Sequence, residues 1–426
     1  MANARDIAVK ALLAVSLDDG YSNIVLDSAV KSSGLSGADA ALASALFYGV
    51  LDRRITLDYI IKQCSSRSPK VPELVREVLR TAVYQLVYMD KIPPFAAVNE
   101  AVKAVKKSKF SFAAGYVNAV LRQVQRQAPT LPQDDSVQSV SVRYSCEPWI
   151  VERLFADYGT AAAKSVLESA LTPPPLYLRV NSQKCSADML VASLESDGIK
   201  AKKVDSEPYA VIASGAVEPT EAYRGGLFHV QDLACQQCCE ALCLNDGMRV
   251  LDCCAAPGGK TFTVAQLMNA TGEVVARDIY PHRVKLITDG AARLGLGNIV
   301  AKLGDASVYD ASLWEFDRVL CDVPCSGIGV IRRKPDIKYK SPQGIDALPE
   351  LQYKILTSGA QSLKSGGVLV YSTCTLFKSE NSEVVSRFLS EHKDFEPYPF
   401  ENGQYMRTLM PQDGTDGFFY ARIRRR

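Results

Sequence analysis

The sequence predicts a multidomain protein with an α-helical bundle, a small α+β module and a Rossmann-like α/β domain, in that order. Three patterns support this fold class. Apolar residues recur every three or four positions early in the chain, short strands mix with helices in the middle, and buried strands alternate with helices from Met248 onward. Since one domain averages roughly 100–200 residues, the 426 residues fit three parts, which we place at 1–130, 140–245 and 246–426.

The helical bundle is predicted from stretches such as 75–86, where apolar residues fall on one helix face. These residues are Val75, Val78, Leu79, Ala82, Val83 and Leu86. Pro93–Pro94 is expected to end one helix, and Val98 to begin the next. The polar stretch Ala128–Asp135 contains two prolines and is predicted to be a linker.

The middle part combines both types of secondary structure. Helices are expected around Trp149–Tyr158 and at Ala187–Asp197. Short strands are expected at 176–180, 209–213 and 227–230. This mixture predicts the small α+β module.

The last part alternates strands with helices, which predicts a mainly parallel sheet covered on both faces. Strands are expected at 248–254, 272–279, 298–305, 316–323 and 366–373. Helices are expected at 260–268 and 281–294, with helical material between the later strands as well. In such a sheet, ligands bind outside the carboxyl ends of the strands, where the strand order reverses. We therefore expect the chemistry along one rim.

Composition excludes several classes of protein. A hydrophobic content of 47% with 23% charged residues is typical of a globular chain and excludes a disordered or fibrous protein. No apolar run approaches the roughly 20 residues of a membrane span, and the first residues show no signal-peptide core, so we expect a cytoplasmic protein. Twelve cysteines in a long chain without an export signal are expected to be reduced thiols.

No metal site is expected. Cys235, Cys238, Cys239 and Cys243 lie at helical spacing in an apolar segment, and no second ligand pair follows at zinc-finger distance. Cysteine is among the most buried residue types, so a packed helix face is the favoured interpretation. With only three histidines in the chain, catalytic zinc is also disfavoured.

Basic residues are unevenly distributed although the net charge is only +2. The first run lies within 101–130, which contains no acidic residue, and comprises Lys103, Lys106, Lys107, Lys109, Arg122 and Arg126. The second comprises Arg332, Arg333, Lys334, Lys338 and Lys340, opposed by Asp336 alone. One such run is usually solvated surface, but runs beside a candidate catalytic loop favour a polyanion such as nucleic acid.

The loop Cys254–Lys260 (CAAPGGK) joins the first strand of the last part to its helix. Its glycines permit close approach of a ligand, and the helix offers free amides. A phosphate-binding P-loop would need a glycine where Cys254 stands, and the G-x-G-x-x-G fingerprint does not occur. A nucleoside ligand without a phosphate chain is the better expectation.

Acids end four successive strands of this part. They are Asp252, Asp278, Asp305 and Asp322. Each alone could be a helix cap, but together they favour a ligand at the rim, and Asp278 is placed to accept hydrogen bonds from ribose hydroxyls. An adenosine-containing cofactor is expected, and S-adenosylmethionine suits the missing phosphate loop.

Two thiols, Cys325 in DVPCSG and Cys374 in YSTCT, follow predicted strands into polar loops. Buried cysteines are commonly inert, but nearby Lys260 and the second basic run could lower a thiol pKa. A thiol nucleophile beside a methyl donor suggests methylation of a pyrimidine, because carbon 5 of the base accepts a methyl group only after a thiolate has added to carbon 6. The residues alone do not decide which of the two thiols attacks.

Three motifs resemble those of the RNA cytosine-C5 methyltransferases: DCCAAPGGKT, DVPCSGIGV and YSTCTLFKSEN. The stretches GGLFHVQDLACQ and DGFFYARI also fit that family. AVNEAVKAVKK and FAAGYVNAVLRQV resemble the helical RNA-binding domain of the antitermination factor NusB. The order of parts, over essentially the full chain, resembles the Sun/Fmu family of bacterial 16S rRNA methyltransferases.

The resemblance implies a role for each matched position. Cys374 would be the nucleophile, and Cys325 would assist breakdown of the covalent adduct. Asp278 would bind the ribose of S-adenosylmethionine, Asp305 would lie near the adenine, and Asp322 would face both cofactor and target base. The methionine part would be held by Cys254, Ala255, Ala256, Pro257, Gly258, Gly259 and Lys260. Cys253 departs from the larger apolar residue that family members often carry there, which is expected only to soften packing.

The resemblance also implies the partner, which is 16S rRNA, either naked or in an early small-subunit particle, with the protein acting as a monomer. Two alternatives stay open. The same chemistry could act on another RNA such as tRNA, or the chain could be a non-catalytic RNA-binding assembly factor. Retention of both cysteines and every strand-end acid disfavours the last alternative.

Overall fold

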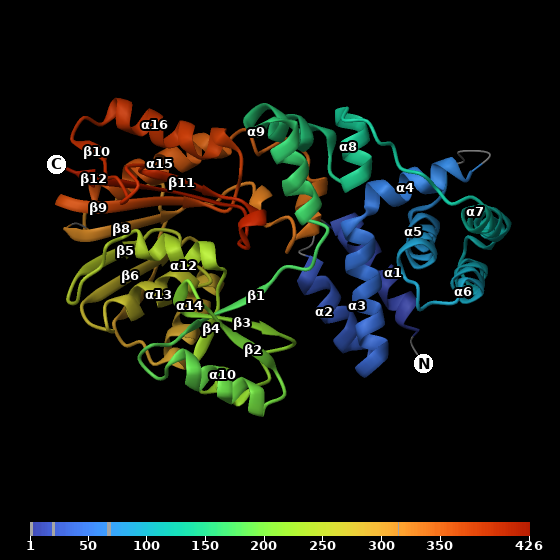
Figure 1. Ribbon diagram of the computed structural model, residues 1–426, viewed down its shortest axis with the longest axis horizontal. Coiled ribbons are helices and arrows are strands. Elements are labelled where there is room, and N and C mark those ends of the chain that lie inside the picture. The colour runs from blue at the N-terminus through green and yellow to red at the C-terminus, as the bar shows by residue number, and fades with distance from the viewer. Residues whose placement is uncertain (1–2, 19–21, 66–69, 314) are drawn as a thin grey trace. The chain divides into compact units, whose positions relative to one another are not determined.

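The structure is a computed structural model that describes residues 3–18, 22–65, 70–313 and 315–426. The chain divides into two compact units (Figure 1). Unit 1 comprises Met1–Leu171 and Arg333–Lys340, and unit 2 comprises Thr172–Arg332 and Ser341–Arg426. Within the described ranges, no helix combines the length and the apolar character that crossing a membrane requires.

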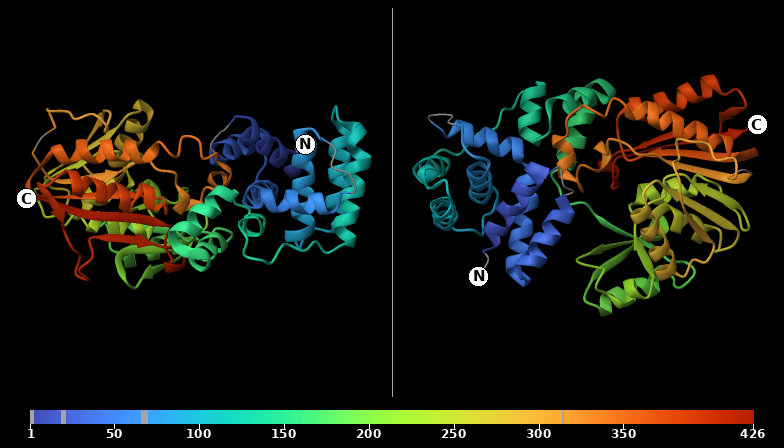
Figure 2. Two further views of the ribbon diagram at one scale, coloured as in Figure 1. Left: turned by 90° about the horizontal axis from the view of Figure 1, so that it is seen from above. Right: turned by 180° about the vertical axis from the view of Figure 1, so that it is seen from behind.

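Unit 1 contains the predicted helical bundle, whose helices pack against one another in all views of Figure 1 and Figure 2. The bundle helices are α1 (Ala4–Asp18), α2 (Ser22–Ser33), α3 (Gly37–Asp52), α4 (Arg54–Gln63), α5 (Glu73–Tyr88), α6 (Pro94–Lys107) and α7 (Ala114–Arg126). The apolar face predicted within 75–86 lies in the core, with only Leu86 partly exposed. The helix expected to begin at Val98 begins at Pro94 instead, because proline is tolerated in the first helical turn.

Two further helices, α8 (Val137–Tyr144) and α9 (Pro148–Ser169), follow the loop that contains the predicted linker. Both belong to unit 1. Helix α9 extends well beyond the predicted Trp149–Tyr158 and kinks at Gly159, which has a left-handed φ of 76°. The three-part division at 130, 140 and 245 stays a prediction.

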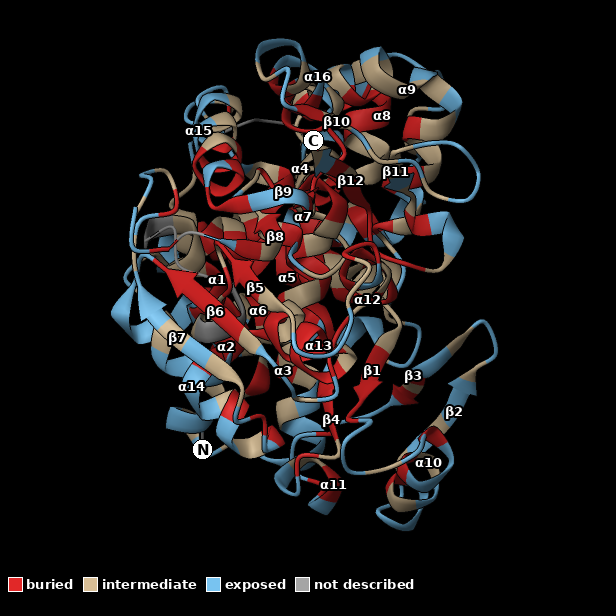
Figure 3. Ribbon diagram, turned by 90° about the vertical axis from the view of Figure 1, so that its left-hand side faces the viewer, coloured by how far each residue is buried: buried red, intermediate tan, exposed pale blue. Residues whose placement is uncertain are grey.

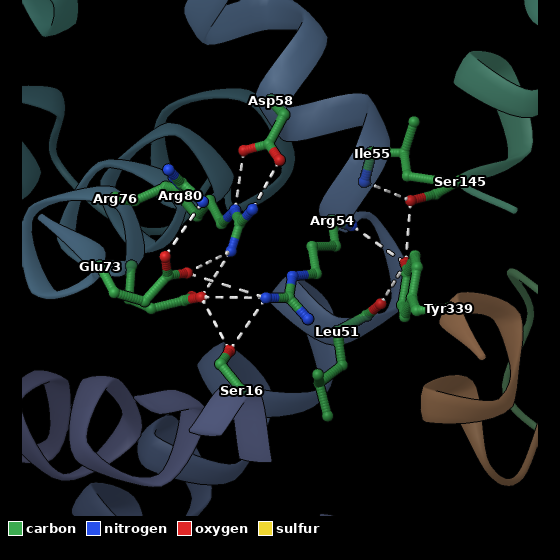
Figure 4. A network of polar contacts seen from close by, with 11 residues as sticks. Ser16, Leu51, Arg54, Ile55, Asp58, Glu73, Arg76, Arg80, Ser145 and Tyr339 are labelled. Atoms are coloured by element: carbon green, nitrogen blue, oxygen red, sulfur yellow. Dashed lines mark hydrogen bonds and ion pairs between the residues drawn. The ribbon is translucent and has the colours of Figure 1, made fainter. Parts of the chain in front are cut away.

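A cluster of charged side chains around the buried Arg80 links helices of the bundle (Figure 4). Arg80 of α5 is 3% exposed, and its Nε and Nη2 donate to the two carboxylate oxygens of Asp58 at 2.7 and 2.5 Å. Its Nη1 donates to Glu77 Oε1 at 2.5 Å. Because a buried charge is tolerated only when paired and hydrogen-bonded, this cluster ties α4 to α5.

The second predicted basic run is not an open surface. Lys338 is fully buried, and its Nζ donates to the carbonyl oxygen of Asp52 at 2.7 Å. The hydroxyl of Tyr339 donates to Leu51 O at 2.5 Å and accepts from the Arg54 backbone N–H at 3.1 Å (Figure 4). Among the five basic residues, Lys334 and Lys340 are exposed and Arg332 and Arg333 are partly exposed, so Lys338 is the one that is withdrawn from the surface, and contact of this run with nucleic acid stays a prediction.

Unit 2 begins with an antiparallel sheet in the order β2-β3-β1-β4. Its elements are β1 (Leu176–Val180), α10 (Ala187–Ser196), β2 (Lys200–Val204), β3 (Glu207–Ser214), α11 (Glu221–Arg224) and β4 (Phe228–Val230). This confirms the α+β module. Strand β2 was not predicted because its sequence, KAKKV, is largely charged, which is typical of a strand at a sheet edge.

The large sheet of unit 2 has the strand order β10-β12-β9-β8-β5-β6-β7, with β11 beside β12. Its strands are β5 (Arg249–Asp252), β6 (Glu273–Asp278), β7 (Ile299–Leu303), β8 (Phe316–Asp322), β9 (Leu363–Thr373), β10 (Phe395–Pro397), β11 (Met406–Leu409) and β12 (Phe418–Arg425). Strands β5 to β9 run parallel, which confirms the Rossmann-like core. Strands β10 to β12 pair antiparallel and were not predicted, so the sheet is mixed.

Helices accompany this sheet at α12 (Leu233–Glu240), α13 (Gly259–Leu267), α14 (Pro281–Leu294), α15 (Leu348–Gln361) and α16 (Ser382–Glu391). Figure 3 shows the central strands buried and the edge strand β7 largely exposed. The expected helical material between β7 and β8 is not found among the described residues of that connection. The strand order reverses at β5, with β6 and β7 on one side and β8 and β9 on the other. A ligand crevice is therefore expected at the carboxyl ends of β5 and β8.

Candidate active site

The predicted site residues lie along the carboxyl edge of the parallel strands. Asp252, Asp278 and Asp322 are the last residues of β5, β6 and β8, and Asp305 follows two positions after the end of β7. Cys374 follows directly after β9, and Cys325 lies three positions after β8. Because parallel strands end at one edge, the sheet brings to one rim residues that are spread over more than a hundred positions.

Asp322 forms the central ion pair of the rim. Its Oδ2 lies 2.7 Å from Lys260 Nζ, and its Oδ1 accepts a hydrogen bond from Ser372 Oγ at 2.8 Å. Burial acts to lower the pKa of Lys260, but the Asp322 carboxylate opposes it, and the resulting pKa lies well above the ordinary value. Lys260 is therefore a charged partner of Asp322 rather than a group reserved for activating a thiol.

Asp252 differs from the other rim acids. It is 1% exposed, and its Oδ2 accepts from Thr261 Oγ1 at 2.7 Å in the first turn of α13. Burial raises its pKa to about 7. Asp252 therefore ties the end of β5 to the start of α13, and this bond spans the loop Cys254–Lys260 between them.

The loop Cys254–Lys260 is closely packed. The Ala255 N–H donates to Arg277 O at 2.7 Å, which holds the loop against β6. Gly258 caps α13 with a left-handed φ of 113°, and a Cβ at this position would lie 2.4 Å from the Phe262 ring. Only glycine fits there without a shift of the helix. Pro257 is exposed and Cys254, Ala256 and Gly259 are partly exposed, so one side of the loop faces outward.

Asp278 and Asp305 keep oxygens available for a ligand. Asp278 is 6% exposed, and within the described part of the chain its carboxylate accepts one hydrogen bond, from the Tyr280 N–H to Oδ1 at 3.0 Å. The next residues, Ile279 and Tyr280, are about half exposed, at 52% and 49%. Asp305 Oδ1 accepts from the Ser307 hydroxyl and N–H at 2.7 and 2.8 Å, and these bonds lower its pKa. Asp278 thus adjoins exposed apolar surface, whereas Asp305 mainly shapes its own turn.

The two predicted reactive thiols meet although they stand 49 positions apart. Cys325 Sγ and Cys374 Sγ are 3.2 Å apart, and both residues are partly exposed. The hydrogen bond with Cys374, together with burial, raises the pKa of the Cys325 thiol well above its ordinary value. Backbone bonds from Val323 N to Ser372 O and from Gly329 N to Cys374 O, each of 3.0 Å, hold the two loops together.

Glu380 braces both cysteine loops, and the sequence patterns assigned it no role. It is fully buried, and its Oε1 accepts from the hydroxyls of Ser326 at 2.5 Å and Thr375 at 3.3 Å. Its Oε2 accepts from the Ser326 N–H and from Gln352 Nε2, both at 2.9 Å. Ser326 follows Cys325 and Thr375 follows Cys374, so one carboxylate positions both thiols. The signal that could have found it is the single acidic residue in the segment KSEN, which follows the loop of Cys374.

Replacing Glu380 by glutamine is expected to lower both stability and turnover. A carboxamide accepts through one oxygen, so at least one buried donor loses its partner, which costs about 1–3 kcal/mol of unfolding free energy. Loosening of the two loops should lower the rate of the reaction at the cysteines at least about tenfold, with cofactor affinity unchanged. Chemical denaturation and single-turnover kinetics check this.

The exposed Glu383→Gln in the same segment is the matched control and should behave as wild type. Unchanged denaturation midpoint and rate in Glu380→Gln would mean that Glu380 does not brace the loops.

The four-cysteine segment shows no metal geometry. Among the described residues, no group of three or more His, Cys, Asp and Glu side chains is arranged to hold a metal ion. Cys235, Cys238 and Cys239 lie on α12 as predicted, and the last two are fully buried. Cys243 lies beyond the end of α12 with a left-handed φ of 53°, so its assignment to the helix face was wrong. Its Sγ accepts from Arg422 Nη1 at 3.0 Å.

Comparison with known families shows three matches. The model for "16S rRNA methyltransferase RsmB/F" matches residues 239–424, that for "NusB family" matches 2–126, and that for "Methyltr_RsmF/B-like, ferredoxin-like domain" matches 147–218. A Bacillus subtilis protein named "Probable ribosomal RNA small subunit methyltransferase B" is 38% identical, with 100% of this chain and 99% of that protein covered.

Two solved structures are similar in fold. The crystal structure of PH0851 superposes with a TM-score of 0.84 at 24% identity and covers 100% of this chain and 99% of its own. A "Methyltransferase Homolog Protein from Pyrococcus Horikoshii" has a TM-score of 0.61 at 29% identity, with 69% of this chain and 100% of its own covered. At 24% identity, the likeness to PH0851 shows similarity of fold alone.

Proposed function

Because the chain belongs to the 16S rRNA methyltransferase RsmB/F family, we propose that it transfers a methyl group from S-adenosylmethionine to carbon 5 of a cytosine in 16S rRNA through a covalent cysteine adduct. The observation that carries this proposal is the pair of thiols, Cys325 and Cys374, with their sulfur atoms 3.2 Å apart at the carboxyl rim. A single reactive thiol would suffice for many reactions. A pair suits a reaction in which one sulfur adds to the base and must later leave it.

In this proposal Cys374 is the nucleophile. Its thiolate adds to carbon 6 of the cytosine, which forms an S–C bond and moves the electron pair of the 5,6 double bond to carbon 5. S-adenosylmethionine, when bound, supplies an electrophilic methyl group for that carbon. Loss of the carbon-5 proton then returns the electron pair, restores the double bond and expels the Cys374 thiolate.

Cys325 is proposed to assist the last step. The hydrogen bond with Cys374 and burial raise the pKa of the Cys325 thiol, which favours the form that can donate a proton. At 3.2 Å it can donate its proton toward Cys374 Sγ, which favours departure of that sulfur from carbon 6. The distance is the same from either sulfur, so the division of roles rests on the resemblance of the two motifs to those of the family.

The rim residues fit S-adenosylmethionine. Asp278 keeps Oδ2 unbonded and thus able to accept from ribose hydroxyls, and exposed Ile279 offers apolar surface to an adenine. The outward side of the loop Cys254–Lys260 would hold the methionine part, with Asp305 near the adenine. Asp322, held by Lys260 and Ser372, would face the cofactor and the target base.

The proposed partner is 16S rRNA, naked or in an early small-subunit particle. The basic residues of α6, α7 and the loop between them are all exposed, which supports contacts to phosphates that carry no sequence information. A target base in a single-stranded loop can be splayed into the site. We retain the three-part division at 1–130, 140–245 and 246–426, a monomeric state, a cytoplasmic location and the lack of a metal as parts of the proposal.

The proposal is tested by incubating the purified protein with S-adenosylmethionine and either naked 16S rRNA or total tRNA, followed by bisulfite sequencing. New 5-methylcytosine in 16S rRNA is the expected result. Methylation of tRNA alone would assign the same chemistry to another RNA. RNA binding without methylation of naked rRNA or of small-subunit particles would favour a non-catalytic assembly factor.

A further inference from the structure

A polar cleft of about 710 Å³ lies in unit 2, away from the cysteine rim. It is bordered by the loop after β1, by β3 and by the end of α13 (Figure 1). Its polar lining includes Arg179, Gln183, Lys184, Tyr209, Gln266 and Asn269. None of the predicted site residues lines it. Gln266 lies seven residues beyond Gly259, about 10 Å along α13 at 1.5 Å per residue.

Arg179 is a buried cation with unused donors. It is 2% exposed, and among the residues that the structure describes its hydrogen bonds run from Nη1 alone, to Gln236 Oε1 at 3.3 Å and Glu240 Oε1 at 3.5 Å. Its Nε is buried without an acceptor. The guanidinium lies over the ring of Tyr209, 4.8 Å from the centroid. Since guanidinium has five N–H donors and leaving them unpaired is unfavourable, Arg179 has donors left for a further acceptor besides Glu240.

Other lining groups have the same character. Gln266 is 2% exposed, and both its Oε1 and its Nε2 are buried without a partner. Lys184 Nζ donates to the backbone carbonyls of Gly225 and Arg293 rather than to a carboxylate. Of the described residues, no Asp or Glu lines the cleft, and the carboxylate paired with Arg179 is that of Glu240. The cleft therefore presents positive charge together with an unused amide donor and acceptor.

We propose that this cleft binds one nucleotide of the substrate RNA, with its phosphodiester on Arg179 and its base on Tyr209. This inference rests on the proposed function, which makes RNA the substrate. The volume is in the range of ordinary ligand pockets, roughly 300–1,000 Å³. Tyr209 is 40% exposed and offers a ring face for stacking, while the Gln266 amide can both donate to and accept from a base edge. Free inorganic phosphate would use Arg179 and leave the ring and the amide unused.

Gln183→Glu tests the charge of the cleft. The Gln183 side chain is exposed and makes no hydrogen bond of its own, so the variant adds a negative charge without removing a contact. We expect the Kd for a labelled, naked 16S rRNA transcript to rise about fivefold or more at low salt. The slope of log affinity against log salt concentration should become shallower by the equivalent of about one phosphate contact. Gln404→Glu, exposed and outside the cleft, is the matched control and should bind as wild type.

Tyr209→Ala and Tyr209→Phe test the stacking. Alanine should weaken binding of the same transcript about tenfold, whereas phenylalanine should retain wild-type affinity. Thermal unfolding of each variant should match wild type, which separates lost contacts from lost folding.

Inorganic phosphate, titrated calorimetrically, distinguishes the source of the anion. If phosphate binds wild type and not Gln183→Glu while RNA affinity is unchanged, the cleft is a small-anion site and the RNA assignment is overturned. If the variants change neither affinity, the cleft has no binding role. Lack of 5-methylcytosine with intact, Gln183-sensitive RNA binding would instead refute the proposed methylation and leave the cleft assignment standing.

Discussion

Cys374→Ala should abolish methyl transfer, with the single-turnover rate falling by about four orders of magnitude or more. The physical reason is that carbon 5 of cytosine attacks a methyl group only after a thiolate has added to carbon 6, and alanine offers no such group. Because Cys374 follows β9 rather than lying in the loop Cys254–Lys260, affinity for S-adenosylmethionine should stay within about twofold of wild type. Methyl transfer to 16S rRNA, followed with labelled cofactor, and calorimetry check the two parts.

Cys64→Ala controls for loss of a thiol as such, since Cys64 is buried in unit 1 and belongs to the helical core. It should keep wild-type activity. Appreciable 5-methylcytosine formation by Cys374→Ala would refute the assignment of Cys374 as nucleophile.

Cys325→Ala should instead trap a covalent protein–RNA complex. Without the thiol 3.2 Å from Cys374 Sγ, the adduct still forms but its breakdown slows, so the protein stays attached to the methylated base. With RNA and S-adenosylmethionine present, we expect a large share of the protein in a retarded band on a denaturing gel, whereas wild type should show little. Nuclease treatment should return the band nearly to the position of free protein.

The double variant Cys325→Ala, Cys374→Ala is the matched control, because it lacks both the helper and the attacking sulfur and should trap nothing. Trapping by Cys374→Ala and not by Cys325→Ala would reverse the two roles.

Local patterns predicted the elements that depend on local physics. Helix α14 occupies the predicted 281–294, because its apolar period and the proline at its first position are both properties of a short stretch. The five parallel strands were predicted from their apolar runs. Strand β2 was missed because its lysines suit an edge. The helix expected between β7 and β8 is not found among the described residues of that connection, since alternation of strands and helices elsewhere does not fix the conformation of one connection.

Contacts between distant residues lay beyond those patterns. Glu380 belongs to the motif YSTCTLFKSEN, but the motif does not show what its carboxylate contacts. The packing of α15 and the two cysteine loops shows that this carboxylate accepts hydrogen bonds from Ser326, Thr375 and Gln352. Lys338 was read as surface charge, yet it is buried against Asp52, 286 positions away. A residue's burial depends on what covers it, which its own neighbours in the chain do not specify.

The sequence by itself determined the fold class and indicated the candidate site residues, because periodicity, strand-end acids and loop glycines are properties of short stretches. Without the family resemblance, it left the roles of Cys325 and Cys374 open. The tertiary structure alone decided that their sulfurs lie 3.2 Å apart, that Lys260 is paired with Asp322, and that Arg179 and Gln266 share a cleft. These relations arise when parallel strands end at one edge and a second module packs beside them, since distance and burial are properties of the packed chain.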